Sequence, residues 1–327
     1  MVGDCARSTL RTYRGGDESE IWRLWNQCLP REGISWEQFL KKTILDQNFD
    51  PEGAIVAEAD GRIVGFAYSI LRRIPMQGID LEPERGWLTA IFVDPDYRRR
   101  GIASAMLDQI VAFLARNGRR VLSVSPYTPN YFWPGVDSGH HPEADRFFQK
   151  HGFEIKSAPH AMEADLRFFA IPAEVSEKIR QLEEEGICIQ FIEPKLYVPL
   201  FTTIEQHFSA EWLRVAREAL WRGASQDSIL VAVRDKPDGT AEVVGWCQYG
   251  GYDDMPERFG PFGVIEAMRG KQIGKALLYR CMETMRQKGL HSVWFLWTHL
   301  DSPAGKLYQK AGFKPYRQFH VYEKALA

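Results

Sequence analysis

The chain has 327 residues, of which 45% are hydrophobic and 13% aromatic, and its formal net charge at pH 7 is −2. The length favours two domains of about 150 residues each, and the composition is sufficient for two packed cores. The balance of charges excludes the strong basic bias of a dedicated nucleic-acid-binding protein, so we expect no nucleic-acid partner.

In the first part of the chain, apolar residues recur with the periods of alternating strands and helices. We expect a strand at 10–13, a helix at 17–29 with Asp17 as its cap, and a second helix at 35–49. A hairpin follows at 54–71, joined by the favoured two-residue turn Asp60-Gly61. The further expected elements are a central strand at 87–93, a long helix from Ile102, a strand at 121–124, a helix from near Glu143, and a closing strand at 160–169.

The segment from Phe92 to Gly118 contains a candidate phosphate-binding loop. A strand ending near Val93 leads through a basic, glycine-containing loop into an amphipathic helix. Such a loop directs unpaired backbone N–H groups and the positive end of the helix dipole toward one place, and arginines add charge. We therefore expect these residues to bind a phosphate-bearing cofactor: Phe92, Val93, Arg98, Arg99, Arg100, Gly101, Ile102, Ala103 and Ser104.

A second copy of this pattern lies between Phe262 and Gly289. The spacing from Val264 to Arg269 equals that from Val93 to Arg98, and downstream ADRFFQKHGF, from Ala144, aligns with AGKLYQKAGF, from Ala304. Two motifs in the same order in each half argue against the alternative, a basic helix start that binds nothing. The candidate binding residues of this copy are Phe262, Val264, Arg269, Gly270, Lys271, Gln272, Ile273, Gly274 and Lys275.

The repeat predicts two domains of one plan. We expect an N-terminal domain at 1–169, a connecting helix at 170–186 and a C-terminal domain at 187–327. The second domain is expected to contain a strand at 187–193, two helices through Trp221, a hairpin at 228–249, a central strand at 259–264, a strand at 291–297, and a last helix followed by strands at 313–326.

These motifs resemble those of the GNAT acetyltransferase superfamily. Arg98-x-x-Gly101-x-Ala103 is similar to the Q/R-x-x-G-x-G/A loop that holds the pyrophosphate of acetyl-CoA, and the segment from Ala304 to Phe313 is similar to the A-x-x-L-Y-x-x-x-G-F motif. The resemblance implies an α+β fold of two tandem GNAT (acyl-CoA N-acyltransferase) domains. Each is expected to be a mixed, mostly antiparallel sheet flanked by helices, with two central parallel strands that splay apart around acetyl-CoA. The layout is similar to mycothiol synthase, in which one half works, although the resemblance does not identify that substrate.

The resemblance further implies an acetyl-CoA-dependent N-acetyltransferase that transfers the acetyl group directly to a primary amine of a small molecule, through a tetrahedral intermediate. The backbone N–H of Val264 would be the oxyanion donor, and Tyr308 would be the general acid. Phe148 occupies the position of Tyr308 in the first half. The alternative is that Tyr308 only packs in the core. Gln272 replaces the loop glycine of the first half and is compatible with the loop if its φ is negative. We expect catalysis in the second half, with weak CoA binding or a scaffold role in the first.

Two loops contain candidate acceptor-binding residues. Asp253, Asp254 and Glu257 precede the second central strand and could help to deprotonate an ammonium group through water, and the alternative is a solvated acidic loop. In the first half, an aromatic loop contains Tyr131, Phe132 and Trp133. It is either the wall of a substrate pocket or a surface excursion packed by its own rings.

Cysteine and histidine usage predicts no metal site. The five cysteines are odd in number and lack C-x-x-C spacing, so we expect reduced thiols in a cytoplasmic protein. The adjacent His140 and His141 lack a supporting ligand set, and we expect them to be exposed to solvent. Because no apolar run has the length of a membrane span, we expect no membrane partner. We further expect a monomer or a homodimer.

Two other functions remain open from the sequence. The acceptor could be a protein or peptide amine, which an open cleft without the aromatic loop over it would favour. The chain could instead bind acyl-CoA without catalysis, since Phe148 and Gln272 each impair one half. Release of CoA in the presence of amines separates catalysis from binding alone.

Overall fold

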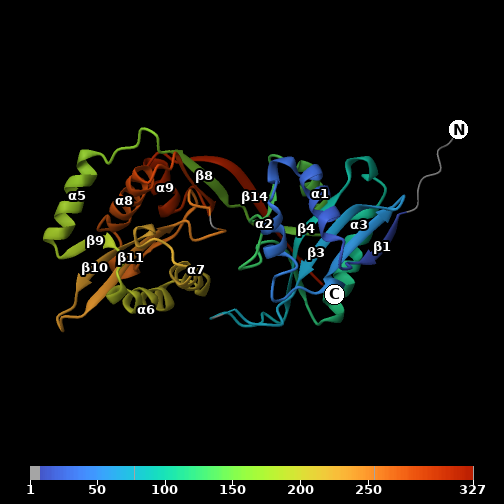
Figure 1. Cartoon of the computed structure of the whole chain (residues 1–327), viewed down its shortest axis with the longest axis horizontal. Coiled ribbons are helices and arrows are strands. Elements are labelled where there is room, and N and C mark those ends of the chain that lie inside the picture. Colours follow the sequence, from blue (N-terminus) through green and yellow to red (C-terminus); the bar gives the residue numbers. More distant parts are fainter. Residues whose placement is uncertain (1–7, 77, 254, 327) are drawn as a thin grey trace. The chain divides into compact units, whose positions relative to one another are not determined.

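The computed structural model of the chain describes residues 8–326 except Gln77 and Asp254. The described residues form two compact units (Figure 1). The first unit contains residues 8–158 and 319–326, and the second contains Pro159–Gln318. Each unit has the predicted architecture, a mixed and mostly antiparallel sheet flanked by helices.

The elements of the first unit follow the predicted order. Its strands are β1 (Thr9–Thr12), β2 (Ala54–Ala59), β3 (Arg62–Ile70), β4 (Arg85–Val93), β5 (Val121–Val124), β6 (Val136–Asp137), β7 (Glu154–Ser157) and the last part of β14 (Lys314–Ala325). Its helices are α1 (Glu18–Cys28), α2 (Trp36–Lys42), α3 (Ile102–Arg116) and α4 (Pro142–Lys150), with 3-10 turns η1 (Pro30–Glu32), η2 (Pro51–Gly53) and η3 (Pro95–Tyr97).

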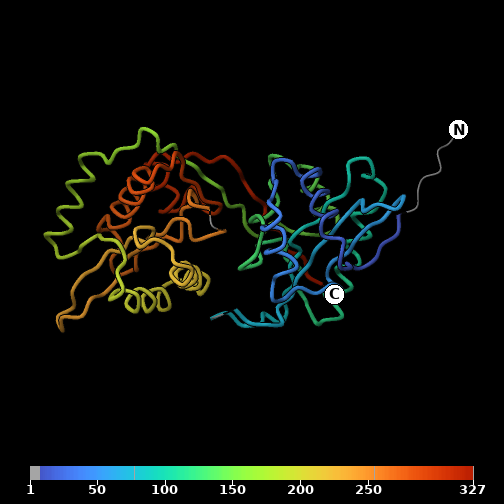
Figure 2. Tube along the Cα trace, in the orientation of Figure 1, coloured from blue at the N-terminus to red at the C-terminus, as the bar shows by residue number. Residues whose placement is uncertain are grey.

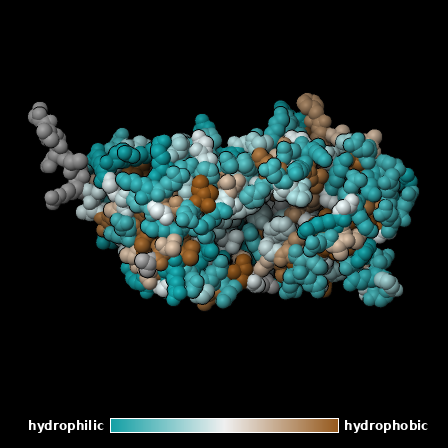
Figure 3. Space-filling model, turned by 180° about the vertical axis from the view of Figure 1, so that it is seen from behind, coloured by the Kyte–Doolittle hydropathy of each residue, from teal (hydrophilic) through white to brown (hydrophobic). Residues whose placement is uncertain are grey.

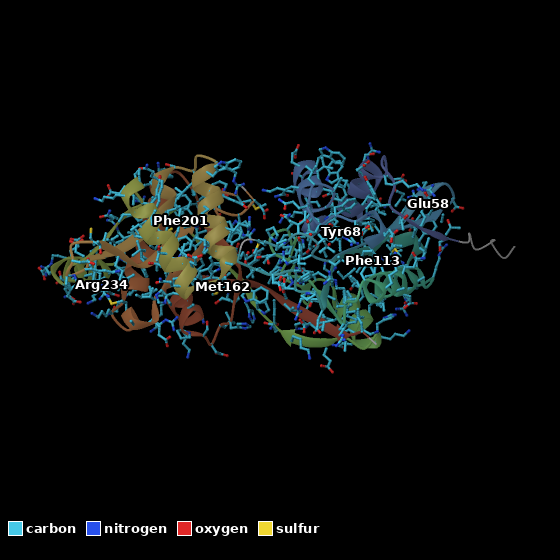
Figure 4. All side chains as sticks on the ribbon, turned by 90° about the horizontal axis from the view of Figure 1, so that it is seen from below. Glu58, Tyr68, Phe113, Met162, Phe201 and Arg234 are labelled. Carbon is cyan, nitrogen blue, oxygen red and sulfur yellow. The ribbon has the colours of Figure 1, made fainter. Side chains whose placement is uncertain are left out.

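Two hydrophobic clusters cover the two faces of this sheet. In Figure 1, α1 and α2 lie on one side of β3 and β4, and α3 lies on the other. Tyr68 of β3 belongs to the cluster with α1, and Phe113 of α3 belongs to the opposite cluster; Figure 4 labels both. Because side chains alternate along a strand, β3 contributes to both cores, and burial along it is nearly continuous.

The second unit repeats the plan. Its strands are β8 (His160–Asp165), β9 (Ile187–Phe191), β10 (Ile229–Asp235), β11 (Ala241–Tyr249), β12 (Phe259–Val264), β13 (Ser292–Thr298) and the first part of β14. Its helices are α5 (Ala173–Glu184), α6 (Tyr197–His207), α7 (Ala210–Trp221), α8 (Ile273–Gln287) and α9 (Pro303–Lys310), with 3-10 turns η4 (Pro194–Leu196), η5 (Gln226–Ser228) and η6 (Glu266–Met268). Figure 4 labels Phe201 of α6, Met162 of β8 and Arg234 of β10.

The closing strands of the two halves are exchanged. β8, predicted to close the first half, pairs with β13 in the second unit, where Ser292 lies opposite Asp165. β14 pairs with β8 through residues 314–318 and then with β5 and β7 of the first unit, where Tyr322 lies opposite Val124. Figure 2 shows the red end of the trace among the blue and green strands. The grouping therefore differs from the predicted boundaries at 159–169 and at 319–326, because either strand has the alternation needed for either sheet edge.

Most predicted elements are confirmed. The short strands β6 and β7 are not among the predicted elements, β8 ends at Asp165 instead of continuing to residue 169, and one helix is shorter than predicted. α2 ends at Lys42 instead of continuing to residue 49. The hydroxyl of the following Thr43 donates a hydrogen bond to the Phe39 carbonyl, and residues 43–48 form turns. Asp17 precedes α1 as predicted, but its side chain forms an ion pair with Arg11 at 2.7 Å instead of capping the helix.

The face of the molecule drawn in Figure 3 is largely polar. On the face shown in Figure 3, hydrophilic residues predominate and hydrophobic residues form small separate groups. Among the helices formed by the described residues, none is both long enough and apolar enough to cross a membrane.

Candidate functional site

The loop before α3 has the geometry of an anion-binding helix start. Gly101 precedes the helix with a φ of 83°, and a Cβ added to it would meet no atom within 4 Å. The glycine is therefore needed for its backbone conformation and leaves the space above the loop open. Arg98 is anchored, because its Nε donates to the Val93 carbonyl at 3.0 Å, and Arg99 has a φ of 62°. The helix N-terminus and its exposed arginines thus face the same open space.

The loop before α8 has the same shape with the glycine at the other position. Here Gly270 has a φ of 82° and Gln272 a φ of 66°, in place of Arg99 and Gly101. The condition that Gln272 has a negative φ is therefore not met, and its backbone is held in the left-handed region. Each loop contains two left-handed residues and one glycine at those positions, so both sequences form the same turn.

The two central parallel strands separate in each unit. β4 and β5 pair from Arg85–Val121 to Leu88–Val124, and the pairing ends there. In the second unit, Arg258, the residue before β12, forms an isolated parallel bridge with Trp294 of β13. The predicted splayed strands are thus present in both units, and the edge of β4 from Thr89 to Val93 borders the opening.

A bulge in each central strand lies at the opening. Tyr68 pairs with Ala90 and Ser69 with Leu88, so Thr89 is an extra residue in β4. In β12 the extra residue lies within Gly260–Pro261, because Cys247 pairs with Phe262 and Tyr249 with Phe259. The bulge bends β4 at the point where it leaves β5.

The backbone N–H groups of Val93 and Val264 are directed into these openings. The Asp94 amide donates to Val64 and the Ile265 amide to Val244, which makes Val93–Gly65 and Val264–Gly245 non-hydrogen-bonded pairs. In such pairs the N–H points away from the partner strand. The amide of Val264, the predicted oxyanion donor, therefore has the direction that this role requires, as does that of Val93.

The opening of the first unit is a cavity of about 690 Å³. Its walls are strand β4 from Leu88 to Val93, the end of β5 and the loop before α3 at residues 98–101, here called the cradle. The predicted cofactor-binding residues that line it are Phe92, Val93, Arg98, Arg99, Gly101, Ile102, Ala103 and Ser104. Arg100 lies differently, because its guanidinium stacks on the Tyr97 ring at 4.9 Å and donates to the Asp96 carbonyl.

A buried carboxylate and a histidine line the same cavity. Glu32 at the end of η1 has a side chain that is 5% exposed, and its Oε2 lies 3.1 Å from His141 Nε2. The hydrogen bond to Glu32 raises the pKa of His141 against the opposing effect of burial. His140 bonds to Asp137 at 2.7 Å. The two histidines, predicted to be exposed, are instead partly buried, with 29% and 22% of their side chains accessible, and each has a carboxylate partner. Glu32 lies too far from His141 in sequence for a local pattern to reveal the contact.

The aromatic loop contributes one wall of this cavity. Trp133 lines it together with Trp25 and Phe319, the latter from the exchanged strand β14. Phe132 is buried instead against the Trp25 ring, with ring centroids 4.5 Å apart. Tyr131 accepts a hydrogen bond from Lys42 through its backbone carbonyl. The loop is thus packed by its own rings and also borders the cavity.

Tyr308 lies in an aromatic cluster of the second unit. Its ring centroid is 4.4 Å from that of Phe295, and Phe259, Phe262 and Phe313 surround it. Burial raises the pKa of Tyr308, so the phenol is protonated at neutral pH. Phe148, its counterpart, stacks on Tyr322 with ring centroids 5.6 Å apart.

The other predicted residues of the second unit have mixed surroundings. Asp253 forms an ion pair with the buried Arg258 at 2.8 Å, an arrangement that holds the loop, and Asp254 lies outside the described residues. Glu257 is half-buried, and its carbonyl accepts from Trp294. At the start of α8, Arg269, Gly270, Lys271 and Gln272 are exposed, Ile273 is buried, Gly274 lies beside Phe262, and Lys275 pairs with Glu174 at 3.5 Å.

Comparison with known proteins identifies both units. The model of the acetyltransferase (GNAT) family matches residues 19–153 and 197–313. An uncharacterized N-acetyltransferase of Methanocaldococcus jannaschii is 30% identical over 121 residues, which is 37% of this chain and 46% of that relative. The chain thus spans less than half of that relative's length.

Solved structures show the same fold over the whole length. A glucosamine N-acetyltransferase region in a fungal multi-domain β-N-acetylglucosaminidase superposes with a TM-score of 0.78 at 19% identity, over 98% of this chain and 38% of that one. A GCN5-related N-acetyltransferase from Sphaerobacter thermophilus gives a TM-score of 0.69 at 18% identity, over 100% and 97% of the two chains. At these identities the likeness concerns the fold.

Proposed function

Because this chain belongs to the acetyltransferase (GNAT) family, we propose that it transfers an acetyl group directly from acetyl-CoA to a primary amine of a small molecule. One observation carries the proposal. A single cavity joins a helix start suited to phosphates with a polar pocket suited to an amine. Both ends lie within the first unit.

The cradle fits acetyl-CoA. Gly101 leaves open space where a Cβ would otherwise stand, and Arg98 and Arg99 supply charge for a pyrophosphate. The unpaired edge of β4 offers the Val93 amide to the acyl carbonyl. When bound, acetyl-CoA supplies an activated thioester, and the protein positions it and excludes water.

The other end of the cavity fits a small cationic acceptor. Glu32 and Glu143 provide negative charge. Trp133, which is only partly buried, provides an aromatic ring whose face can bind a cation. A wall built from the aromatic loop favours a small molecule over a protein side chain. The fungal structure named for glucosamine makes that amine a sensible first acceptor to test.

We place the reaction in the first unit. The sequence-based expectation was the second unit, on the strength of Tyr308, whose ring is packed among aromatic neighbours there. The first unit combines the cradle, the open strand edge and two carboxylates in one cavity. The second unit then serves as a weaker CoA site or as a scaffold that completes β8 and β14.

Paired variants test both the function and its location. We expect purified protein to release CoA from acetyl-CoA when a panel of small amines, including glucosamine, is present. Gly101→Glu should abolish this release and weaken acetyl-CoA binding in calorimetry, because its carboxylate would meet the phosphates. Gly118→Glu is the matched control, since Gly118 has a φ of 75° and equally open space at the other end of α3. Tyr308→Phe should retain activity.

Each alternative predicts a different outcome. Full activity in Gly101→Glu together with loss in Tyr308→Phe would move the reaction to the second unit. Binding without CoA release for any amine would support a non-catalytic acyl-CoA-binding protein. Release with peptides alone would support a protein acceptor.

A further inference from the structure

His141 and Glu32 form a pair that the cradle does not explain. The imidazole comes from the start of α4 and the carboxylate from η1, elements far apart in sequence that meet at the cavity. An ionised Glu32 can only accept a hydrogen bond, so with the carboxylate ionised the contact of 3.1 Å assigns the N–H of His141 to Nε2, which donates to Glu32 Oε2. The Nδ1 atom is 3.6 Å from Glu143 Oε1, which is longer than a hydrogen bond. Neutral His141 therefore keeps a lone pair on Nδ1.

We propose that His141, oriented by Glu32, is the base that removes a proton from the ammonium form of the acceptor in the cavity of the first unit. The role rests on the proposed function. An alkylammonium has a pKa near 10.4, so about 4 to 5 kcal/mol are needed to deprotonate it at pH 7 without help. A general base within reach reduces this cost and typically contributes 10²- to 10⁴-fold in rate.

The step is a simple proton transfer. The N–H bond of the ammonium breaks and its electron pair remains on nitrogen as the lone pair that attacks. The proton forms a bond to His141 Nδ1, and the resulting imidazolium is stabilised by the buried Glu32 carboxylate. After the acetylated product leaves, the proton passes to solvent, since His141 is 22% exposed.

The charged groups around His141 set its pH response. Glu32 of η1 and Glu143 of α4 lie within 4 Å of the ring. Arg146 and Lys150 of α4 also line the cavity. The neutral imidazole is the active form, so kcat/KM should rise with pH through the pKa of His141. Removing the Glu32 charge lowers that pKa and moves the rise to lower pH.

Three uncharged variants test the role through pH profiles of kcat/KM. His141→Gln should lower kcat/KM about 100-fold and abolish the acid limb. Glu32→Gln should move the limb down by about one pH unit. His140→Gln is the matched control, because its ring bonds to Asp137 and does not line the cavity, and it should leave the limb in place. Thermal melts establish that each variant is folded.

An NMR titration of the histidine rings gives a readout without any ligand. The resonance lost in His141→Gln should titrate above the ordinary histidine pKa in the unchanged protein and lower in Glu32→Gln. An active protein whose acid limb survives in His141→Gln would overturn the role while leaving the proposed function intact. Absence of CoA release by the unchanged protein would overturn the proposed function and this role together.

Discussion

Deleting residues 319–327 should unfold the first unit and leave the second folded. The deletion removes the part of β14 that pairs with β5 and β7. It takes away four buried side chains, Phe319, Val321, Tyr322 and Leu326. At about 1.5 to 3 kcal/mol each, their burial contributes about 6 to 12 kcal/mol. That range is comparable to the whole stability of a domain, about 5 to 15 kcal/mol.

Hydrogen exchange with peptide-level resolution is the appropriate assay. Protection should disappear in β4 and β5 and persist in β10 and β11. A synthetic peptide of residues 319–327 added in excess should restore protection in β4 and β5, because it can occupy the vacant edge. Tyr322→Ala should lower the free energy of unfolding of the first unit by about 3 to 5 kcal/mol. Leu45→Ala, at a side chain that is 69% exposed, should change it by no more than about 0.5 kcal/mol. Full protection of β5 in the truncated chain would refute the exchange.

Three other substitutions have defined outcomes. Gln272→Gly should stabilise the second unit by about 1 kcal/mol, because glycine adopts the left-handed conformation without strain. The melting temperature should rise, and an unchanged or lower melting temperature would contradict the observed φ. Gly86→Ala should destabilise the first unit by about 1 to 3 kcal/mol in denaturant titrations, because the added Cβ would lie 2.5 Å from Leu114 Cδ2. An unchanged free energy of unfolding would contradict this packing. The pair of His141 with Glu32 raises the folded-state pKa of the imidazole, so its stabilising effect should be fully present below about pH 6.5 and lost as pH rises through the raised pKa. Glu32→Gln should therefore lower the free energy of unfolding more at pH 6 than at pH 8.5. Equal losses at the two pH values would contradict a raised pKa of His141 in the folded protein.

Local and repeated features could be predicted from the sequence. The hairpin around Asp60-Gly61 and the central strand 259–264 are present where expected, because turn chemistry and alternation are local signals. The loop before α3 was recognised because its glycine and arginines are adjacent in sequence. The family match to two segments confirms the tandem arrangement that the repeat indicated.

Features that depend on distant residues could not be predicted. The partner of His141 is more than one hundred positions away, and nothing near either residue signals the contact. The exchange of β8 and β14 depends on which edge each strand reaches, a choice that similar strands leave undetermined. The sign of φ at Gln272 follows from the turn that both loops share, which composition alone does not specify.

The exchange of β14 also sets an order for folding during synthesis. The first unit emerges from the ribosome first, yet β5 has no neighbour on one side until β14 has been translated. The second unit contains β8 and the first part of β14, so the residues that complete the edge of β5 are translated only after those of the second unit. An interrupted translation product would therefore carry an unfinished cofactor cavity, lacking Phe319 in its wall, and an exposed strand edge that chaperones and proteases can recognise.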